Sequence, residues 1–184
     1  MDAIETERLL LVQWSDEYVD DFAALCADAE AMHFISGGRP LPRENVEVIL
    51  GRTRAMWEEY GFGPWAAIEK GTGRWAGRVG LNLLADWPGD DKWEVGFEFA
   101  REFWGRGLAT EGARRAIRFG WEETLLDRII SVTRLDHLAS RRVMEKCGLT
   151  FQAEIPYRGT TVAWYATDRP PDTDAEEDRP SSRA

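Results

Sequence analysis

The sequence predicts a single mixed α/β domain built on one sheet, and three observations lead to this fold class. The chain has 184 residues, a length that fits one domain with one sizeable core. Short apolar runs bounded by turn residues predict strands, and apolar residues at helical spacing predict helices between them. In chain order these are a strand, two helices and a three-strand antiparallel meander, whose last strand leads into a loop, a helix, a strand, a helix and two strands.

The N-terminal part is expected to contain one strand and two helices. Residues 6–12 form an apolar run after a polar start, which predicts the first strand. Ser15 and Asp16 offer a helix N-cap, and the apolar residues at helical spacing that follow are Tyr18, Val19, Phe22, Ala23, Leu25 and Cys26. Residues 33–40 carry Gly-Gly and Pro and predict a loop. A second helix is expected from residues 42–44 until Gly61.

The middle of the chain predicts the meander. Strands are expected over residues 64–69, 75–83 and 93–99, separated by turns at 70–73 and 87–91. In the third strand Val95, Phe97 and Phe99 alternate with Glu94, Gly96 and Glu98. Alternate side chains of a strand point to opposite faces, so the two glutamates share one face.

The C-terminal part predicts a helix over 109–124, a strand over 128–133, and a short helix over 138–147 that Gly148 closes. Two last strands are expected over 151–155 and 161–166. We therefore place the domain at residues 1–167. Residues 168–184 hold six acids, three arginines, three prolines and no large apolar residue, which predicts a disordered acidic tail.

The composition excludes several classes of function. The formal net charge of −10 argues against a general nucleic-acid-binding protein. Residues 101–146 nevertheless hold ten Lys or Arg against seven acids, a local charge of +3 that suggests an anionic small ligand. The apolar runs are too short to span a membrane, and no signal pattern starts the chain, so we expect a cytoplasmic protein.

The cysteines and histidines give no sign of a disulfide framework or a metal site. Cys26 and Cys147 both fall in helical patterns, where a small reduced core residue is expected. His33 and His137 have no partner at a spacing that binds metals, so no metal is expected. A monomer and a homodimer are both compatible with the sequence.

The segment Trp104-Gly105-Arg106-Gly107-Leu108-Ala109-Thr110 lies between a strand and a helix. The first N–H groups of a helix have no internal partner and attract anions, pyrophosphate in particular. Glycine allows close approach of the backbone, and Arg106 would add a full positive charge. The loop thus predicts phosphate binding at a helix N-terminus.

Two other phosphate-binding motifs fit less well. The dinucleotide fingerprint requires Gly or Ala at its sixth position, which is Thr110 when the pattern starts at Gly105. It also belongs to the first unit of a parallel sheet, whereas here a meander precedes it. No Gly-Lys-Ser/Thr phosphate loop is present.

Residues 103–111, Phe-Trp-Gly-Arg-Gly-Leu-Ala-Thr-Glu, resemble the acetyl-CoA loop of the GNAT superfamily of N-acetyltransferases. The Gln/Arg-x-x-Gly-x-Gly/Ala pattern falls on residues 104–109, with Trp104 departing at its first position. The sequence of residues 103–111 is typical of the branch related to ribosomal-protein N-terminal acetyltransferases. Thr6-Glu7-Arg8-Leu9, Glu94 to Phe97 and Asp136 to Leu149 also resemble segments of that branch.

The resemblance covers roughly residues 4–167 and implies a GNAT-type fold, with helices flanking a mostly antiparallel sheet that splays at the acetyl-CoA strand. It implies acetyl-CoA as co-substrate, with its pantetheine arm between the third meander strand and residues 129–133. Cofactor-binding residues are then expected at Phe97, Phe99, Trp104, Gly105, Arg106, Gly107, Leu108, Ala109, Thr110, His137 and Ser140. An amine would attack the acetyl carbon directly, helped by main-chain oxyanion stabilisation, a base and an acid.

The candidates for proton transfer are Glu98, Glu94 and Ser140. Glu98 lies nearer the expected thioester and is the first choice of base, with Glu94 second; a solvated strand face is the alternative for both. Many superfamily members carry a tyrosine acid where Met144 stands here. Ser140 resembles the candidate acid of the N-terminal-acetylating branch, and helix capping is its alternative role. His137 stands where the family usually has an asparagine that bonds the pantetheine arm. The alternative for His137 is a histidine of a surface loop.

The acceptor side carries fewer signals. Of nine tryptophans we expect core positions for Trp14, Trp57, Trp65, Trp93, Trp121 and Trp164. We expect the acceptor cleft to be lined by Trp75, Trp87, His33, Phe34 and Tyr157. The acceptor amine belongs either to a protein or peptide N-terminus or to a small molecule. The alternative function is a non-catalytic acyl-CoA-binding module, favoured by the missing tyrosine.

Overall fold

The computed structural model describes residues 3–36 and 39–171, and it shows one mixed sheet with helices on both faces. The strands lie in the order β1-β2-β3-β4-β5-β6-β8-β7, and every neighbouring pair is antiparallel except β5 and β6. Their bounds are β1 (Ile4–Glu5), β2 (Leu9–Val12), β3 (Pro64–Glu69), β4 (Arg74–Leu83), β5 (Trp93–Phe99), β6 (Arg128–Arg134), β7 (Thr150–Tyr157) and β8 (Thr160–Asp168).

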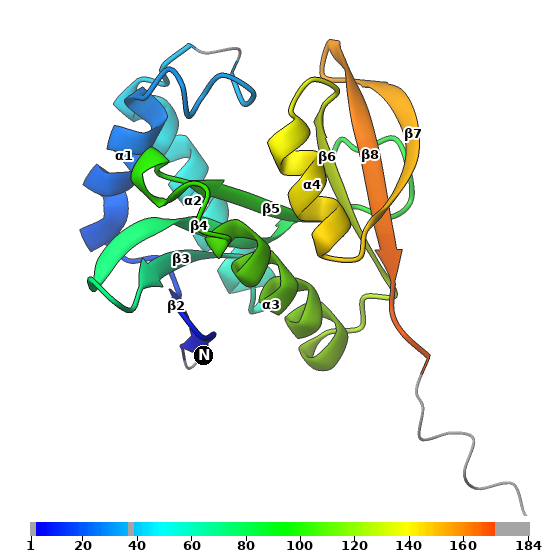
Figure 1. Cartoon of the computed structure of the whole chain (residues 1–184), viewed down its shortest axis with the longest axis horizontal. Coiled ribbons are helices and arrows are strands. Elements are labelled where there is room, and N and C mark those ends of the chain that lie inside the picture. The colour runs from blue at the N-terminus through cyan, green and yellow to red at the C-terminus, as the bar shows by residue number, and fades with distance from the viewer. Residues whose placement is uncertain (1–2, 37–38, 172–184) are drawn as a thin grey trace, which may run out of the picture.

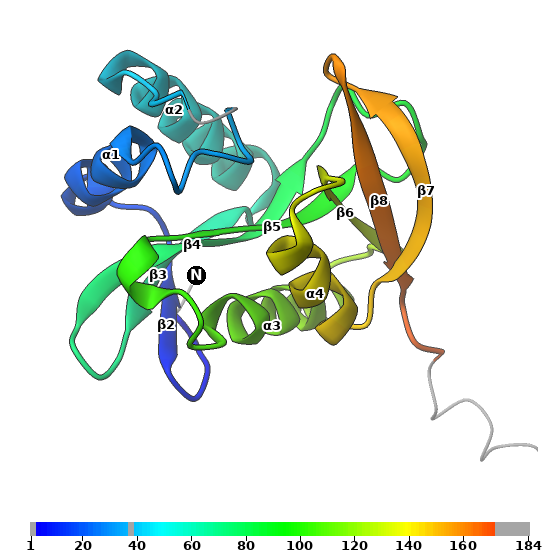
Figure 2. The same cartoon turned by 45° about the horizontal axis from the view of Figure 1, so that its top comes forward.

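The helices form two layers around the sheet (Figure 1). They are α1 (Val19–Ala27), α2 (Arg43–Tyr60), α3 (Leu108–Glu123) and α4 (Leu138–Lys146), with short 3₁₀ turns η1 (Asp16–Tyr18) and η2 (Arg101–Phe103). Figure 2 shows α1 and α2 above β3 to β5, and α3 and α4 below. The predicted fold class is confirmed. No helix in the described segments combines the length and apolar character needed to cross a bilayer.

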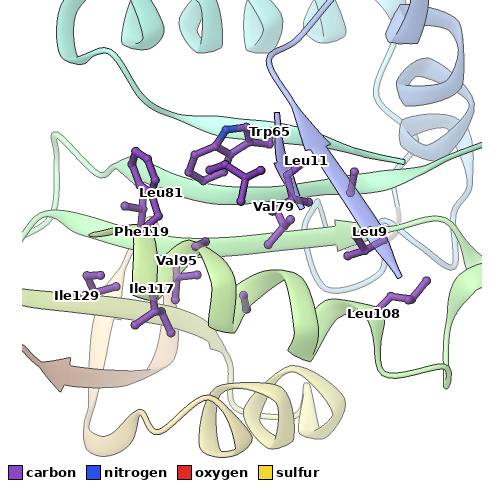
Figure 3. Packing of buried hydrophobic residues seen from close by; sticks show 14 of the residues in the cluster. Leu9, Leu11, Trp65, Val79, Leu81, Val95, Leu108, Ile117, Phe119 and Ile129 are labelled. Carbon is purple, nitrogen blue, oxygen red and sulfur yellow. The ribbon is translucent and has the colours of Figure 1, made fainter. Parts of the chain in front are cut away.

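The main core lies between α3 and the first strands (Figure 3). Trp65, Leu81 and Ile129 are fully buried there, and each buried side chain of this size contributes about 1.5–3 kcal/mol. Gly112 brings α3 close to β4, since a Cβ there would lie only 2.9 Å from Cγ1 of Val79. This packing fixes the start of α3, and with it the loop at 104–110.

The expected first strand over residues 6–12 is shortened to β2, because residues 6–8 form a tight turn, and β1 lies before this turn. The Thr6 hydroxyl accepts a hydrogen bond from the Leu9 N–H at 2.8 Å, and the Thr6 N–H donates to the Leu9 carbonyl at 2.9 Å. A side chain that bonds nearby backbone in this way competes with an extended strand. Local turn chemistry therefore overrides the apolar run.

The final hairpin is longer than expected. β7 and β8 continue to a two-residue turn in which Arg158 and Gly159 both have positive φ, 47° and 77°. Such a turn matches the twist of paired strands and lets pairing reach the hairpin tip. At its other end β8 extends to Asp168, one residue beyond the expected boundary at 167.

Arg169 fastens the end of β8 to the domain. Its guanidinium donates to the carbonyls of Trp121, Thr124 and Leu126 at 2.5, 2.7 and 3.1 Å. The first residues of the expected acidic tail therefore pack on the domain. Residues 172–184, the rest of that tail, lie outside the described residues.

Candidate functional site

Strands β5 and β6 separate soon after they meet. Over the described length of both strands they pair where Glu94 lies opposite Ile130, and the Ser131 hydroxyl donates to the Val95 carbonyl at 2.9 Å. Backbone groups of alternate residues point to the same strand edge. The backbone N–H and carbonyl groups of Phe97 and Phe99 therefore face the widening gap, just as the Val95 carbonyl faces β6. The Phe99 carbonyl accepts a hydrogen bond from Nε1 of Trp104 at 2.6 Å, so the Phe97 backbone is left facing the opening.

A cleft of about 1220 Å³ occupies this gap. It is bordered by α1, α2, β4, β5, β6, the start of α4, and the loops at 28–36 and 103–110. The structure brings nearly all the candidate residues to its wall: Glu94, Phe97, Glu98, Phe99, Trp104, Gly105, Gly107, Leu108, Ala109, Thr110, His137 and Ser140. Arg106 is the candidate that does not line it.

The loop at 104–110 has the geometry expected of an anion site. Gly105 and Gly107 adopt φ of +71° and +79°, a region that side chains rarely enter. Helix α3 begins at Leu108 without a side-chain cap, so the N–H groups of its first turn have no partner inside the helix. Leu108, Ala109 and Thr110 all line the cleft, which places these donors and the positive end of the helix dipole at its wall.

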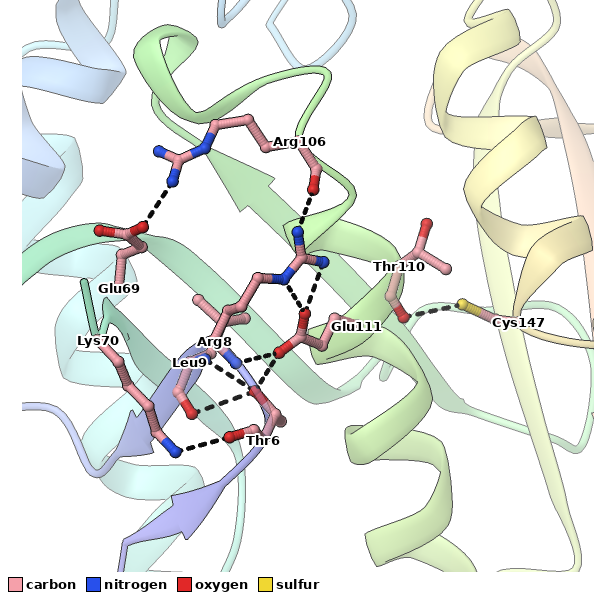
Figure 4. Close-up of polar contacts among 9 residues, drawn as sticks. All are labelled: Thr6, Arg8, Leu9, Glu69, Lys70, Arg106, Thr110, Glu111 and Cys147. Carbon is pink, nitrogen blue, oxygen red and sulfur yellow. Dashed lines mark hydrogen bonds and ion pairs between the residues drawn. The ribbon is translucent and has the colours of Figure 1, made fainter. Parts of the chain in front are cut away.

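Arg106 points away from this anion site. Its guanidinium pairs with Glu69 at 2.5 Å and lies over the Phe103 ring, 5.5 Å from the ring centre (Figure 4). Glu69 is buried and also accepts bonds from the Thr72 N–H and hydroxyl at 3.0 and 2.7 Å. The pKa of Glu69 is lowered by these bonds with Thr72 and by the pair with Arg106, although burial acts in the opposite direction. Arg106 thus holds the loop to the β3–β4 turn.

The opening of the chain clamps the same loop (Figure 4). The Glu111 carboxylate accepts bonds from the Thr6 hydroxyl at 2.5 Å and from the Arg8 N–H and Nε, both at 2.7 Å. Arg8 also donates to the carbonyl of Arg106 at 2.6 Å. Burial opposes ionisation of Glu111, but the bonds from Thr6 and Arg8 outweigh it and lower its pKa. The sequence indicated residues 6–9 and 103–111 as separate motifs, and their contact was not predicted.

Glu98 is held in an ion pair. Its carboxylate accepts bonds from Nε and a terminal nitrogen of Arg78 at 2.7 and 3.2 Å. The two side chains are largely buried, 20% and 17% exposed, and the Arg78 guanidinium lies 5.1 Å from the Phe22 ring centre. Arg78 is directly opposite Glu98 in the β4–β5 register, a pairing that the uncertain length of the intervening turn concealed.

Glu94 has different surroundings. It accepts one hydrogen bond, from the Val132 N–H at 3.2 Å. Within residues 3–36 and 39–171 it forms no ion pair. Burial, with a smaller contribution from nearby Glu98, raises the pKa of Glu94 to about 7 against the opposing effect of the Val132 bond. A carboxyl group that titrates near neutrality can accept a proton at physiological pH.

Ser140 projects into the cleft from the first turn of α4. The N-cap of this helix is His137, so Ser140 does not cap it. Ser140 is buried, and its hydroxyl forms no hydrogen bond with another described residue. Met144, one turn later, is also buried. The hydroxyl is thus available to a ligand in the cleft.

His137 is enclosed rather than exposed. Its ring stacks on Phe34 with the ring centres 3.9 Å apart and an angle of 7° between planes. Nδ1 lies 3.2 Å from the Thr133 hydroxyl, and burial lowers the pKa of the imidazole. The contact joins the loop at 28–36 to the start of α4. Arg101 holds the other end of that loop through ion pairs with Asp28, at 3.0 Å, and Glu30.

The aromatic residues divide into two groups. His33 and Phe34 line the cleft, as expected. Trp75, Trp87 and Tyr157 do not, and this part of the expectation is wrong. Trp75 is buried among α1 side chains, and Trp87 packs edge-on against Tyr157, so both complete local hydrophobic clusters beside their turns.

The positive segment at 101–146 is largely engaged in internal pairs. Arg101, Arg106, Arg118, Arg128 and Arg134 each form an ion pair, and Arg114 donates to a backbone carbonyl. Arg142 and Lys146 lie four residues apart on α4, line the cleft, and form no ion pair with any described residue. They are the site cations that sequence reasoning did not single out. No cluster of three or more metal-ligating side chains occurs among the described residues.

Comparisons with known proteins identify the family of the chain. Residues 8–150 match the family model described as "Acetyltransferase (GNAT) domain". The chain is 30% identical to the FsC-acetyl coenzyme A-N(2)-transacetylase of Aspergillus fumigatus, over 91% of this chain and 80% of that protein.

Solved structures share the fold. An acetyltransferase from Agrobacterium tumefaciens superposes with a TM-score of 0.79 at 22% identity, covering 91% of this chain and 94% of that one. The ribosomal L7/L12 alpha-N-protein acetyltransferase RimL, solved with coenzyme A, gives 0.75 at 16% identity, with 91% and 98% covered.

Proposed function

Because the chain belongs to the GNAT acetyltransferase family and transfers an acetyl group from acetyl-CoA to an amine, we propose that the cleft between β5 and β6 is its active site. The observation that carries the proposal is a single cleft lined by an anion-binding helix start, an open strand edge and a carboxyl group with a pKa of about 7.

We assign the phosphates of acetyl-CoA to the start of α3. The unpaired N–H groups of Leu108, Ala109 and Thr110 donate to the pyrophosphate. Arg142 and Lys146 supply positive charge from the facing helix. The pantetheine arm then runs along the edge of β5 and bonds the backbone of Phe97.

Glu94 is the general base in this proposal, in place of Glu98. Glu98 forms an ion pair with Arg78. Glu94 instead accepts one backbone hydrogen bond and forms no ion pair within the described residues. Glu94 takes a proton from the ammonium of the acceptor, and the neutral nitrogen then attacks the thioester carbonyl carbon. The carbon–sulfur bond breaks, the Ser140 hydroxyl donates a proton to the departing thiolate, and the nitrogen loses its second proton, which restores the Ser140 hydroxyl.

The comparison proteins support an amine acceptor of either kind. One is named for acetylation of N(2) of its substrate, and another for the α-amine of a ribosomal protein. For this chain we propose a primary amine that enters the cleft from the side of α1 and α2, opposite the helix that binds the phosphates.

Substitution of Glu94 by Gln tests the assignment. The amide keeps the size of the side chain and can accept the Val132 bond, but it cannot act as a base. We expect kcat to fall by about 10²-fold or more, with the Kd for CoA unchanged. Glu98→Gln is the comparison variant. If Glu98→Gln abolishes turnover while Glu94→Gln retains it, Glu98 is the base and the assignment is wrong.

A further inference from the structure

We infer that the acceptor is a small monoamine with an apolar body, an inference that rests on the active site proposed above. Three features of the acceptor side carry it: apolar walls, carboxylates neutralised in pairs, and a loop fastened across the cleft. Each is independent of the residues assigned to acetyl-CoA.

The wall formed by α1, α2 and the loop between them is mainly apolar. Its cleft-lining side chains include Phe22, Leu25, Met32, Leu41, Ile49 and Met56. Phe22, Leu25 and Met32 are almost fully buried, whereas Leu41, Ile49 and Met56 are half-buried and present apolar area to the cleft. A bound molecule that covers such a surface gains free energy, because apolar area is removed from water. An acceptor with an apolar body obtains this gain.

The charges on this side leave one half-buried carboxylate for a cation. Glu98 is neutralised by Arg78, and Glu30 by Arg101. Glu59, on the last turn of α2, also lines the cleft and forms no ion pair with a described residue, but it is exposed to solvent. Glu94 is the half-buried carboxylate of the cleft that has no cationic partner among the described residues. One ammonium group is therefore matched inside the cleft, and a second one beside it would be desolvated without compensation.

The loop at 28–36 limits the size of the acceptor. It is held at one end by Arg101 and at the other by the stack of Phe34 on His137. The stack reaches across the cleft, since Phe34 and His137 both line it and His137 precedes α4, whereas Arg101 holds the loop from outside the cleft lining. A peptide chain extending from the reaction centre would have to displace this crossing, whereas a small molecule does not. The geometry therefore favours a small amine over a protein N-terminus.

Acetyl transfer to a panel of amines tests the inference. The probes are 2-phenylethylamine, spermidine, and a tetrapeptide with a free α-amine, with CoA release followed by a thiol reagent. We expect kcat/KM for 2-phenylethylamine to exceed both others by at least about tenfold, which corresponds to about 1.4 kcal/mol. A higher kcat/KM for spermidine or for the peptide overturns the inference but leaves the proposed function standing. No CoA release with any amine contradicts the proposed function itself.

A matched pair of variants on α2 locates the apolar subsite. Ile49 lines the cleft, whereas its neighbour Val48 is 53% exposed and does not. Ile49→Glu should lower kcat/KM for 2-phenylethylamine about tenfold and raise it for spermidine, because it adds a second carboxylate. Val48→Glu adds the same charge outside the cleft and should change neither value.

The Kd for CoA separates a local effect from misfolding. It should be the same in the parent and in both variants, because α2 lies on the face opposite the phosphate site. Equal amine selectivity in Ile49→Glu and the parent, with CoA binding intact, would show that α2 does not contact the acceptor and would overturn the inference.

Discussion

Two glutamates on one strand show how surroundings decide chemistry at the scale of a residue. Glu94 and Glu98 share a face of β5 and both line the cleft. The cross-strand partner of Glu98 is Arg78, which binds its carboxylate, while that of Glu94 is the neutral Asn82. A buried carboxyl without a cation is costly to ionise, and this is why the pKa of Glu94 is raised.

The raised pKa of Glu94 predicts a pH dependence for the reaction. A base acts when it is deprotonated, so kcat should increase with pH through about 7 and level off above it. The dependence of kcat is the appropriate measurement, since it reports groups in the enzyme–substrate complex. The Glu94→Gln variant should lose this transition. A parent kcat that stays constant between pH 5.5 and 8.5 would contradict the assignment.

At the scale of the elements, the starts of two helices face one cleft. Helix α3 offers uncapped N–H groups, and α4 offers Ser140 in its first turn and Arg142 and Lys146 beyond it. The two helices lie on the same side of the sheet (Figure 2). Their arrangement places the charge for phosphates and the candidate acid on one wall, away from the apolar wall formed by α2.

Removing the positive charges of α4 should weaken the binding of acetyl-CoA and leave the binding of the amine unchanged. We expect Arg142→Ala and Lys146→Ala each to raise KM for acetyl-CoA about 5–10-fold, since a charge-assisted hydrogen bond contributes roughly 1.5–3 kcal/mol before solvent screening reduces it. KM for the amine should not change. Arg118→Ala is the control, because Arg118 pairs with Glu122 outside the cleft. An equal effect of all three substitutions would point to overall charge instead of a phosphate contact.

At the scale of the whole molecule, the first residues of the chain stabilise a loop about one hundred positions later. Glu111 receives bonds from Thr6 and Arg8, and Arg8 bonds the loop itself. These contacts fasten β2 to the start of α3, while β5 and β6 diverge beside it. The clamp therefore keeps the loop at 104–110, which is the proposed phosphate site, in place where the sheet opens.

Loss of the clamp should reduce both stability and donor binding. We expect Glu111→Ala to lower the free energy of unfolding by about 1–3 kcal/mol and to raise KM for acetyl-CoA. Because the pKa of Glu111 is lowered in the folded state, its stabilisation is present above pH 4.5 and is lost as the pH falls below this value. The difference between parent and variant, measured by denaturant unfolding, should shrink accordingly.

Glu7→Ala provides the control for the clamp. Glu7 is the exposed carboxylate between Thr6 and Arg8, and it makes no hydrogen bond or ion pair with a described residue. It should leave stability and KM unchanged. If Glu111→Ala unfolds at the same denaturant concentration as Glu7→Ala, the clamp does not contribute to stability.

Local signals in the sequence were enough for the elements, the fold class and the loop at 104–110. Strand β5 was predicted with its observed bounds, and α3 and α4 to within one residue at each end. Glycines at positive φ, helix starts and strand alternation depend on nearby residues, so they can be read from a short segment. The turn at Thr6 escaped because its side chain replaces strand pairing with a local bond.

Contacts between distant segments were decided by the tertiary structure alone. The pairing of Arg78 with Glu98 depends on the strand register. The stack of Phe34 on His137 requires two loops to meet across the cleft. Arg106 points away from the proposed phosphate site because it pairs with the buried Glu69. Ion pairing and burial set the charge and availability of a side chain, and both depend on neighbours far along the chain. The residues themselves thus predicted the loop at 104–110, and packing decided which carboxylate remained available beside it.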